Sequence, residues 1–221
     1  MCGRFAFYSP SEAAAALFGA PASTEVQPRY NIAPTQYIAA IRNGSEGREL
    51  AMLRWGLVPS WAKDPSIGNR MINARAETVA EKPSYRAAFR HRRCVVLADG
   101  FYEWRRESDA KTPYFISLAS GEPFALAGLW ENWSDKSSGE SLQTTTLITT
   151  AANGFMLPLH HRMPLVLQPD AATEWLAGSA ELLEQAGDET PKLQAWPVDR
   201  RVNNARNEGE ELIDAVGDVI Q

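Results

Sequence analysis

Short apolar runs separated by Gly, Pro or Ser are the feature that most constrains the fold of this 221-residue chain. Runs of this length suit strands of an antiparallel sheet and are too short for the usual helix. Two of them, residues 37–42 and 49–54, flank Asn43-Gly44 and predict a β-hairpin whose turn contains that pair. The other predicted strands are residues 94–98, 101–105, 114–118, 124–129, 144–150 and 164–167.

Helix signals are fewer and lie between or beside these runs. Ser9-Pro10-Ser11-Glu12 predicts a helix start before residues 13–18, and Gly19 follows its far end. Further helices are predicted at residues 74–81, 85–90, 171–177 and 180–186. The pattern predicts an α+β chain: a single domain over residues 1–221, with a mixed, mostly antiparallel, β-rich core and peripheral helices.

The N-terminal segment and the cysteines bear on location and cofactors. Cys2-Gly3-Arg4 is followed by alternating residues, without the basic and apolar regions of a secretory signal, and no run reaches membrane-spanning length. Cys2 and Cys94 form no C-x-x-C pair, so neither a disulfide framework nor a metal site is predicted. We therefore expect a cytoplasmic, nucleoid-associated monomer without membrane, metal or cofactor.

The charge is distributed unevenly along the chain. The net charge of −5 by itself argues against a nucleic-acid partner. Residues 1–106, however, hold 15 Lys and Arg against 9 Asp and Glu, whereas residues 107–221 hold 7 against 18. Arg predominates in the basic half, and Arg suits bidentate phosphate contact. A solvated basic face without a partner fits the charge pattern equally well.

Cys2 is the residue with the most distinctive chemistry. Removal of Met1 before a small second residue would leave a cysteine with a free α-amine, which is a 1,2-aminothiol. Its amine and thiol have reference pKa values of about 7.7–8.0 and about 8.5, so both nucleophiles are accessible near neutral pH. The amine can form an imine with an aldehyde, and the thiol can then close a five-membered thiazolidine. An incidental cysteine at a frayed terminus is the alternative.

Glu103 and His160 are the candidate proton-transfer residues. Glu103 lies within Gly-Phe-Tyr-Glu-Trp, where burial among aromatic residues would raise its pKa toward that of a useful acid or base. An edge-strand carboxylate facing water is the alternative. His160 directly precedes a predicted strand, where a histidine serves equally well as a structural hydrogen-bond donor.

Two further segments carry side chains suited to a DNA strand. Asn73 is a plausible helix N-cap, or else an amide that orients a reacting group while Arg75 holds phosphate. Trp55 and Trp61 lie in a Gly- and Pro-containing loop, where exposed indoles would form a base-stacking platform. Core packing is the alternative for these tryptophans.

Seven motifs in order along the chain resemble the SRAP family, the SOS response-associated peptidases and abasic-site processing proteins, from Met1 to about residue 202. They are Met-Cys-Gly-Arg-Phe at the N-terminus, Tyr-Asn-Ile-Ala-Pro-Thr at 30–35, Trp-Gly-Leu-Val-Pro at 55–59, Asn-Ala-Arg-Ala-Glu at 73–77, Arg-Cys at 93–94, Gly-Phe-Tyr-Glu-Trp at 100–104 and His-x-Arg-Met-Pro at 160–164.

The resemblance implies a single SRAP domain whose DNA groove leads to Cys2. It implies that Cys2 crosslinks to the ring-opened sugar of an abasic site in single-stranded DNA, that Asn73 and His160 position and protonate the sugar, and that Glu103 is the general acid/base. The implied DNA-binding residues are Arg4, Pro34, Trp55, Arg75, Arg86, Thr149 and Arg162. His161 stands where relatives often carry an acidic residue, which is expected to alter the pKa of His160.

Three functions therefore remain open at the level of sequence. The favoured one is an enzyme of DNA repair that forms a protective DNA–protein crosslink, with lyase and Met1-removing activity as possible accompaniments. The second is a cysteine peptidase with Cys2 as an N-terminal nucleophile. The third is a module that binds single-stranded DNA without catalysis.

Overall fold

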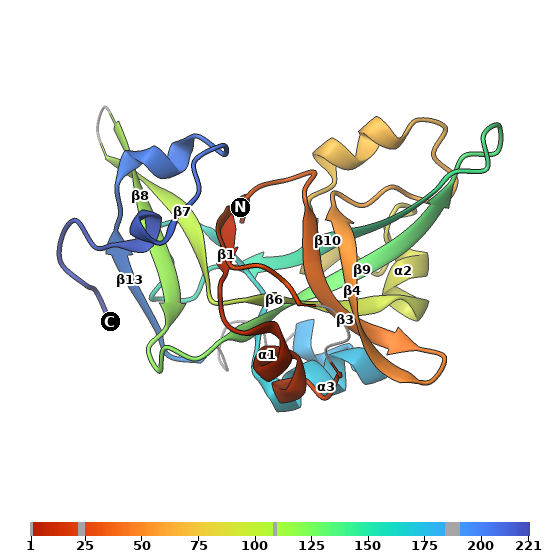
Figure 1. Cartoon of the computed structure of the whole chain (residues 1–221), viewed down its shortest axis with the longest axis horizontal. Helices are drawn as coiled ribbons and strands as arrows, with labels where there is room; N and C mark the ends of the chain where they lie inside the picture. The colour runs from red at the N-terminus through yellow and green to blue at the C-terminus, as the bar shows by residue number, and fades with distance from the viewer. Residues whose placement is uncertain (1, 22–24, 108–109, 184–190) are drawn as a thin grey trace.

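The protein is built from two β-sheets, with the N-terminus lying between them (Figure 1). The computed structural model describes residues 2–21, 25–107, 110–183 and 191–221. The smaller sheet has the strand order β13-β8-β7-β1-β2. Its strands are β1 (Phe5–Phe7), β2 (Arg29–Ile32), β7 (Gly100–Glu107), β8 (Ala110–Leu118) and β13 (Leu193–Pro197).

The larger sheet closes into a small barrel. Its order is β11-β10-β4-β3-β6-β9-β12, and β9 pairs again with β10, which completes a circuit through β4, β3 and β6. Only the pairings of β10 with β4 and β5 are parallel. The strands are β3 (Tyr37–Gly44), β4 (Gly47–Trp55), β5 (Asn73–Arg75), β6 (Arg93–Ala98), β9 (Phe124–Ser134), β10 (Ser141–Ala151), β11 (Arg162–Pro164) and β12 (Val166–Leu167).

Short helices cover the outside of the sheets. α3 begins with Pro169, ends before Gly178 at φ 102°, and docks through the buried Trp175, whose Nε1 donates to the carbonyl oxygen of Cys94 in β6 at 2.9 Å. The α-helices are α1 (Ser11–Leu17), α2 (Arg86–His91) and α3 (Pro169–Ala177); the 3₁₀ turns are η1 (Pro65–Arg70), η2 (Ala76–Thr78), η3 (Glu181–Leu183), η4 (Arg200–Asn203) and η5 (Glu210–Ile213).

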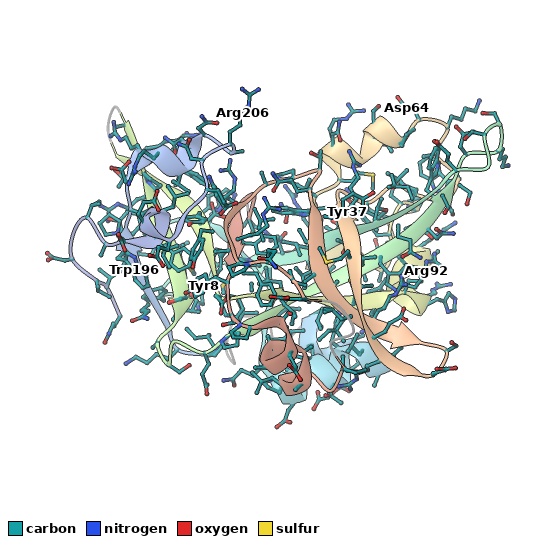
Figure 2. The ribbon with its side chains drawn as sticks, in the orientation of Figure 1. Tyr8, Tyr37, Asp64, Arg92, Trp196 and Arg206 are labelled. Atoms are coloured by element: carbon teal, nitrogen blue, oxygen red, sulfur yellow. The ribbon has the colours of Figure 1, made fainter. Side chains whose placement is uncertain are left out.

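The smaller sheet is buried on both faces. On one face, Phe5 and Phe101 belong to the main hydrophobic core, which includes residues of the barrel strands. On the opposite face, Ala6, Tyr102 and Phe115 belong to a second cluster. Figure 2 labels Tyr8 and Trp196, which pack against this second cluster. Gly100 permits the close packing, because a Cβ there would lie 2.1 Å from the ring of Phe115. β1 is thereby fixed between β2 and β7, and Cys2 precedes its first residue, Phe5, by three positions.

The predicted α+β, β-rich fold is confirmed, and all eight predicted strands lie in observed strands, with 164–167 divided between β11 and β12. The helices predicted at 13–18, 85–90 and 171–177 correspond to α1, α2 and α3. Part of the helix predicted at 180–186 is the 3₁₀ turn η3, and its residues 184–186 lie outside the described residues.

Two local predictions are wrong. The turn of the β3–β4 hairpin is Ser45-Glu46, because Asn43 and Gly44 still pair with Arg48 and Gly47 in the strand register. The helix predicted at 74–81 is instead β5 followed by the single turn η2. β5 pairs in parallel with residues 147–149 of β10, and this tertiary pairing outweighs the local helix propensity of the alanines.

Candidate active site

The peptide of Cys2 joins the two sheets. Asn73 in β5 donates from its Nδ2 to the carbonyl oxygen of Cys2 at 2.8 Å, so an amide on the barrel fixes the N-terminal end of β1. Because Asn73 lies in a strand, it is not the helix N-cap that its sequence context also allowed. The thiol of Cys2 is completely buried in the chain as it stands, with the carbonyl oxygen of Arg4 3.9 Å from its Sγ.

Glu103 lies beside Cys2, on β7. Its side chain is only 3% exposed, and burial raises its pKa above the ordinary value. Burial also raises the pKa of the Cys2 thiol, and the negative charge of Glu103 adds to that rise, which places the two groups within electrostatic range of each other. The carboxyl group is therefore suited to holding and releasing a proton next to the nucleophile.

His160 shares a pocket with Glu103. The pocket has a volume of about 620 Å³, and Trp104 and Pro158 are among its other lining residues. Nδ1 of His160 lies 3.0 Å from the backbone nitrogen and 3.1 Å from the carbonyl oxygen of Arg162, so this backbone can hold the neutral imidazole in place in either tautomer. Burial lowers the pKa of His160, which favours this neutral form.

The four predicted catalytic residues come from four separate segments and are linked by a chain of interactions. Asn73 contacts Cys2 directly, Cys2 and Glu103 interact electrostatically, and Glu103 and His160 line the same cavity. Among the residues that the structure describes, no group of His, Cys, Asp and Glu is arranged to hold a metal ion. Nor does any helix of those residues have the length and apolar character needed to cross a membrane.

Comparison with known proteins identifies the family. The family model described as SOS response associated peptidase (SRAP) matches residues 1–205. The chain belongs to the SRAP family. Abasic site processing protein YoaM of Bacillus subtilis is 44% identical over 97% of this chain and 98% of its own length. Abasic site processing protein YedK of Escherichia coli is 33% identical over 98% of this chain and 100% of its own length. A crystal structure of a protein from Bacteroides thetaiotaomicron superposes with a TM-score of 0.87 at 26% identity, covering 97% of this chain and all of that one.

The arginines of this SRAP domain that were predicted to bind DNA fall into two groups. Arg75 and Arg86 are exposed to solvent. Arg4 is half-buried, and its Nη1 donates to Oδ1 of Asn31 at 2.6 Å and to the carbonyl oxygen of Val202 at 2.7 Å. Thus the side chains of Arg75 and Arg86 are accessible from solvent, whereas Arg4 holds the C-terminal segment in place.

Arg162, Glu77 and Thr149 form a hydrogen-bonded cluster next to His160, here called the clamp. Arg162 makes a two-pronged ion pair with Glu77 and donates from its Nη2 to the carbonyl oxygen of Thr149 at 2.6 Å. Thr149 is fully buried. Because the backbone N–H of Arg162 also holds His160, the clamp fixes the imidazole relative to β10.

The prediction that the Trp55 indole is exposed for stacking is wrong. Trp55 ends β4 inside the core, where it packs edge-on against Phe5 and donates from its Nε1 to the carbonyl oxygen of Ile72 at 2.9 Å. Trp61, in the same sequence segment, is 59% exposed. Pro34 is partly exposed and precedes Thr35, whose φ of 73° is unusual for a β-branched residue.

Asn31 is a residue that sequence reasoning missed. Its side chain is completely buried, and its Nδ2 lies within hydrogen-bond distance of the carbonyl oxygens of Asn204 and Asn207, at 3.1 and 2.9 Å. Its Oδ1 meanwhile accepts the hydrogen bond from Arg4. The sequence signals were its place in the motif at 30–35 and in a short strand, but the carbonyl groups that it contacts are more than 170 residues away.

Proposed function

We propose that this SRAP protein captures abasic sites in single-stranded DNA by forming a thiazolidine crosslink through Cys2 after Met1 has been removed. The observation that carries the proposal is that Glu103 lines a pocket together with His160 and also acts electrostatically on Cys2, whose carbonyl oxygen Asn73 holds. Relatives that match nearly the whole chain are named abasic site processing proteins, which supports DNA of that kind as the substrate.

The proposed chemistry begins with the sugar in its ring-opened aldehyde form. The α-amine of Cys2 attacks the aldehyde carbon, and the resulting carbinolamine loses water to give an imine. Glu103, protonated because burial raises its pKa, donates the proton that the departing hydroxyl needs. The thiol then adds to the imine carbon, its proton passes to the nitrogen, and the five-membered ring closes.

The other two residues have positioning and proton-transfer roles in this proposal. Asn73 holds the carbonyl oxygen of Cys2 and thereby orients the amine and thiol toward the pocket. The backbone of Arg162 holds the imidazole of His160 at the pocket, where the ring can transfer a proton to the sugar oxygen during ring-opening.

The test combines an abasic single-stranded oligonucleotide with intact-mass measurement. Wild type should lose Met1 and gain the mass of the oligonucleotide minus water in a heat-stable adduct. Cys2→Ser keeps an amine but has no thiol, so the stable adduct should disappear while a borohydride-trapped imine remains. Undiminished heat-stable adduct with Cys2→Ser would exclude the thiazolidine.

Cleavage of a peptide by the same protein is the second candidate activity. The matching family description names a peptidase, and an activated cysteine is also the nucleophile required for amide hydrolysis. Incubation with peptides in the same assay separates the two, since peptide cleavage without a DNA adduct would assign the site to amide hydrolysis.

A further inference from the structure

Two cations face each other at the far end of the β7–β8 pair. Arg106 of β7 lies directly opposite Lys111 of β8 in the antiparallel register, and both side chains are exposed. Like charges in directly opposed positions destabilise a sheet. Among the residues that the structure describes, neither cation has an ion-pair partner. An anion bound between them would offset this repulsion.

The two cations line the pocket that contains Glu103 and His160. The edge of β7 explains how they reach it. On the side of β1, the backbone pairing covers Gly100 and Phe101 and ends with the bond from the N–H of Tyr102 to the carbonyl oxygen of Arg4, and no described strand pairs with β7 farther along that side. The charge of Arg106 also acts on His160, where it reinforces the lowering of the pKa caused mainly by burial. The cations therefore lie at the proposed reaction site.

An imidazole lies beside the two cations in the pocket. His161 is exposed and stacks on His160, with ring centroids 4.4 Å apart and planes at 26°. The pocket thus offers a guanidinium fork and an ammonium, which suit the oxygens of a phosphodiester, with an imidazole beside them as a further hydrogen-bonding group. The one carboxylate lining the pocket, Glu103, is buried, whereas Arg106 and Lys111 are exposed.

We propose that Arg106 and Lys111 bind a backbone phosphate of the DNA strand whose sugar enters this pocket. The inference rests on the proposed function, because it takes the occupant of the pocket to be that strand. It adds a phosphate-binding subsite to the one proposed for Arg75 and Arg86, which lie on the side of the barrel. The reacting sugar would then lie between cations from both sheets.

The test uses DNA that carries a tetrahydrofuran abasic analogue, which has no aldehyde and therefore reports reversible binding without crosslinking. Arg106→Gln/Lys111→Gln should bind this DNA about 2- to 30-fold more weakly at low salt, as expected for the loss of two exposed ion pairs. The slope of log K against log salt should fall by about 0.7, which corresponds to one phosphate on a single strand. The matched control is Lys136→Gln/Lys192→Gln, which removes the same charge at two exposed positions outside the pocket and should change the slope less.

Single neutral methylphosphonate substitutions then locate the phosphate. Wild type should lose affinity at one linkage near the analogue, and the Arg106/Lys111 variant should show no further loss at that linkage. An unchanged salt slope, or equal losses in the variant and its control, would overturn the subsite. Failure of wild type to crosslink natural abasic DNA would overturn the proposed function instead, and the reversible-binding measurement would still decide whether the cations bind phosphate.

Discussion

Replacement of Glu103 by Gln separates catalysis from structure more sharply than any other substitution in this site. The amide keeps the size and most of the packing of the carboxyl group but cannot transfer its proton. A positioned acid/base contributes about 10²–10⁴-fold to rate, which corresponds to about 2.7–5.4 kcal/mol of activation free energy. Because Glu103 is 3% exposed, bulk water has little access to replace it, and we expect a loss within this range.

Although Glu103→Gln should slow catalysis, it should not lower the stability of the folded protein above neutral pH. Burial raises the folded-state pKa of Glu103, so the folded protein binds that proton more tightly than the unfolded chain does. The resulting stabilisation is complete below the unfolded pKa of about 4.3 and is lost as the pH rises through the raised folded value. Gln does not ionise, so at pH 8 the free energy of unfolding of Glu103→Gln should equal or exceed that of wild type.

The assay measures single-turnover adduct formation at saturating DNA between about pH 5 and pH 9, a range that spans the reference pKa values of the groups involved. Thermal unfolding of the same samples at pH 8 supplies the stability comparison. The reasoning is refuted if Glu103→Gln forms adduct at the wild-type rate at every pH, or if its defect vanishes once binding is saturated. A large loss of stability at pH 8 would show that Glu103 is a structural carboxylate.

Three further substitutions test binding, reversal and folding. Arg75→Gln and Arg86→Gln should each weaken binding to single-stranded DNA of any sequence and lower the salt slope by about 0.7–1; unchanged slopes in both would place the DNA elsewhere. His160→Gln should slow the release of a preformed adduct at least as strongly as its formation, measured as two separate rates; faster release would remove His160 from the reverse reaction. Asn31→Ala removes several buried hydrogen bonds, each worth about 0.5–1.5 kcal/mol. It should lower the free energy of unfolding, measured in urea, by about 2–4 kcal/mol. A change below about 0.5 kcal/mol, roughly one weak hydrogen bond, would contradict these contacts.

Much of the fold and the identity of the candidate site residues followed from the sequence. Alternating apolar runs determine which residues form strands, because one face of each strand must be buried wherever it pairs. The chemistry of a 1,2-aminothiol likewise depends on local covalent structure alone, namely Cys2 as the second residue and the removal of Met1. The aromatic neighbours of Glu103 allowed either a buried or a water-facing carboxyl group, and the structure shows the buried one.

The tertiary structure decided what depends on contacts between distant segments. Residues 74–81 favour a helix locally, yet residues 73–75 form a strand because they pair in parallel with β10. Trp55 and Trp61 lie in one short loop segment of the sequence, but closure of the barrel buries the first and leaves the second exposed. The opposition of Arg106 and Lys111 arises from a strand register, which hydrogen bonding between two chain segments fixes and which composition does not encode.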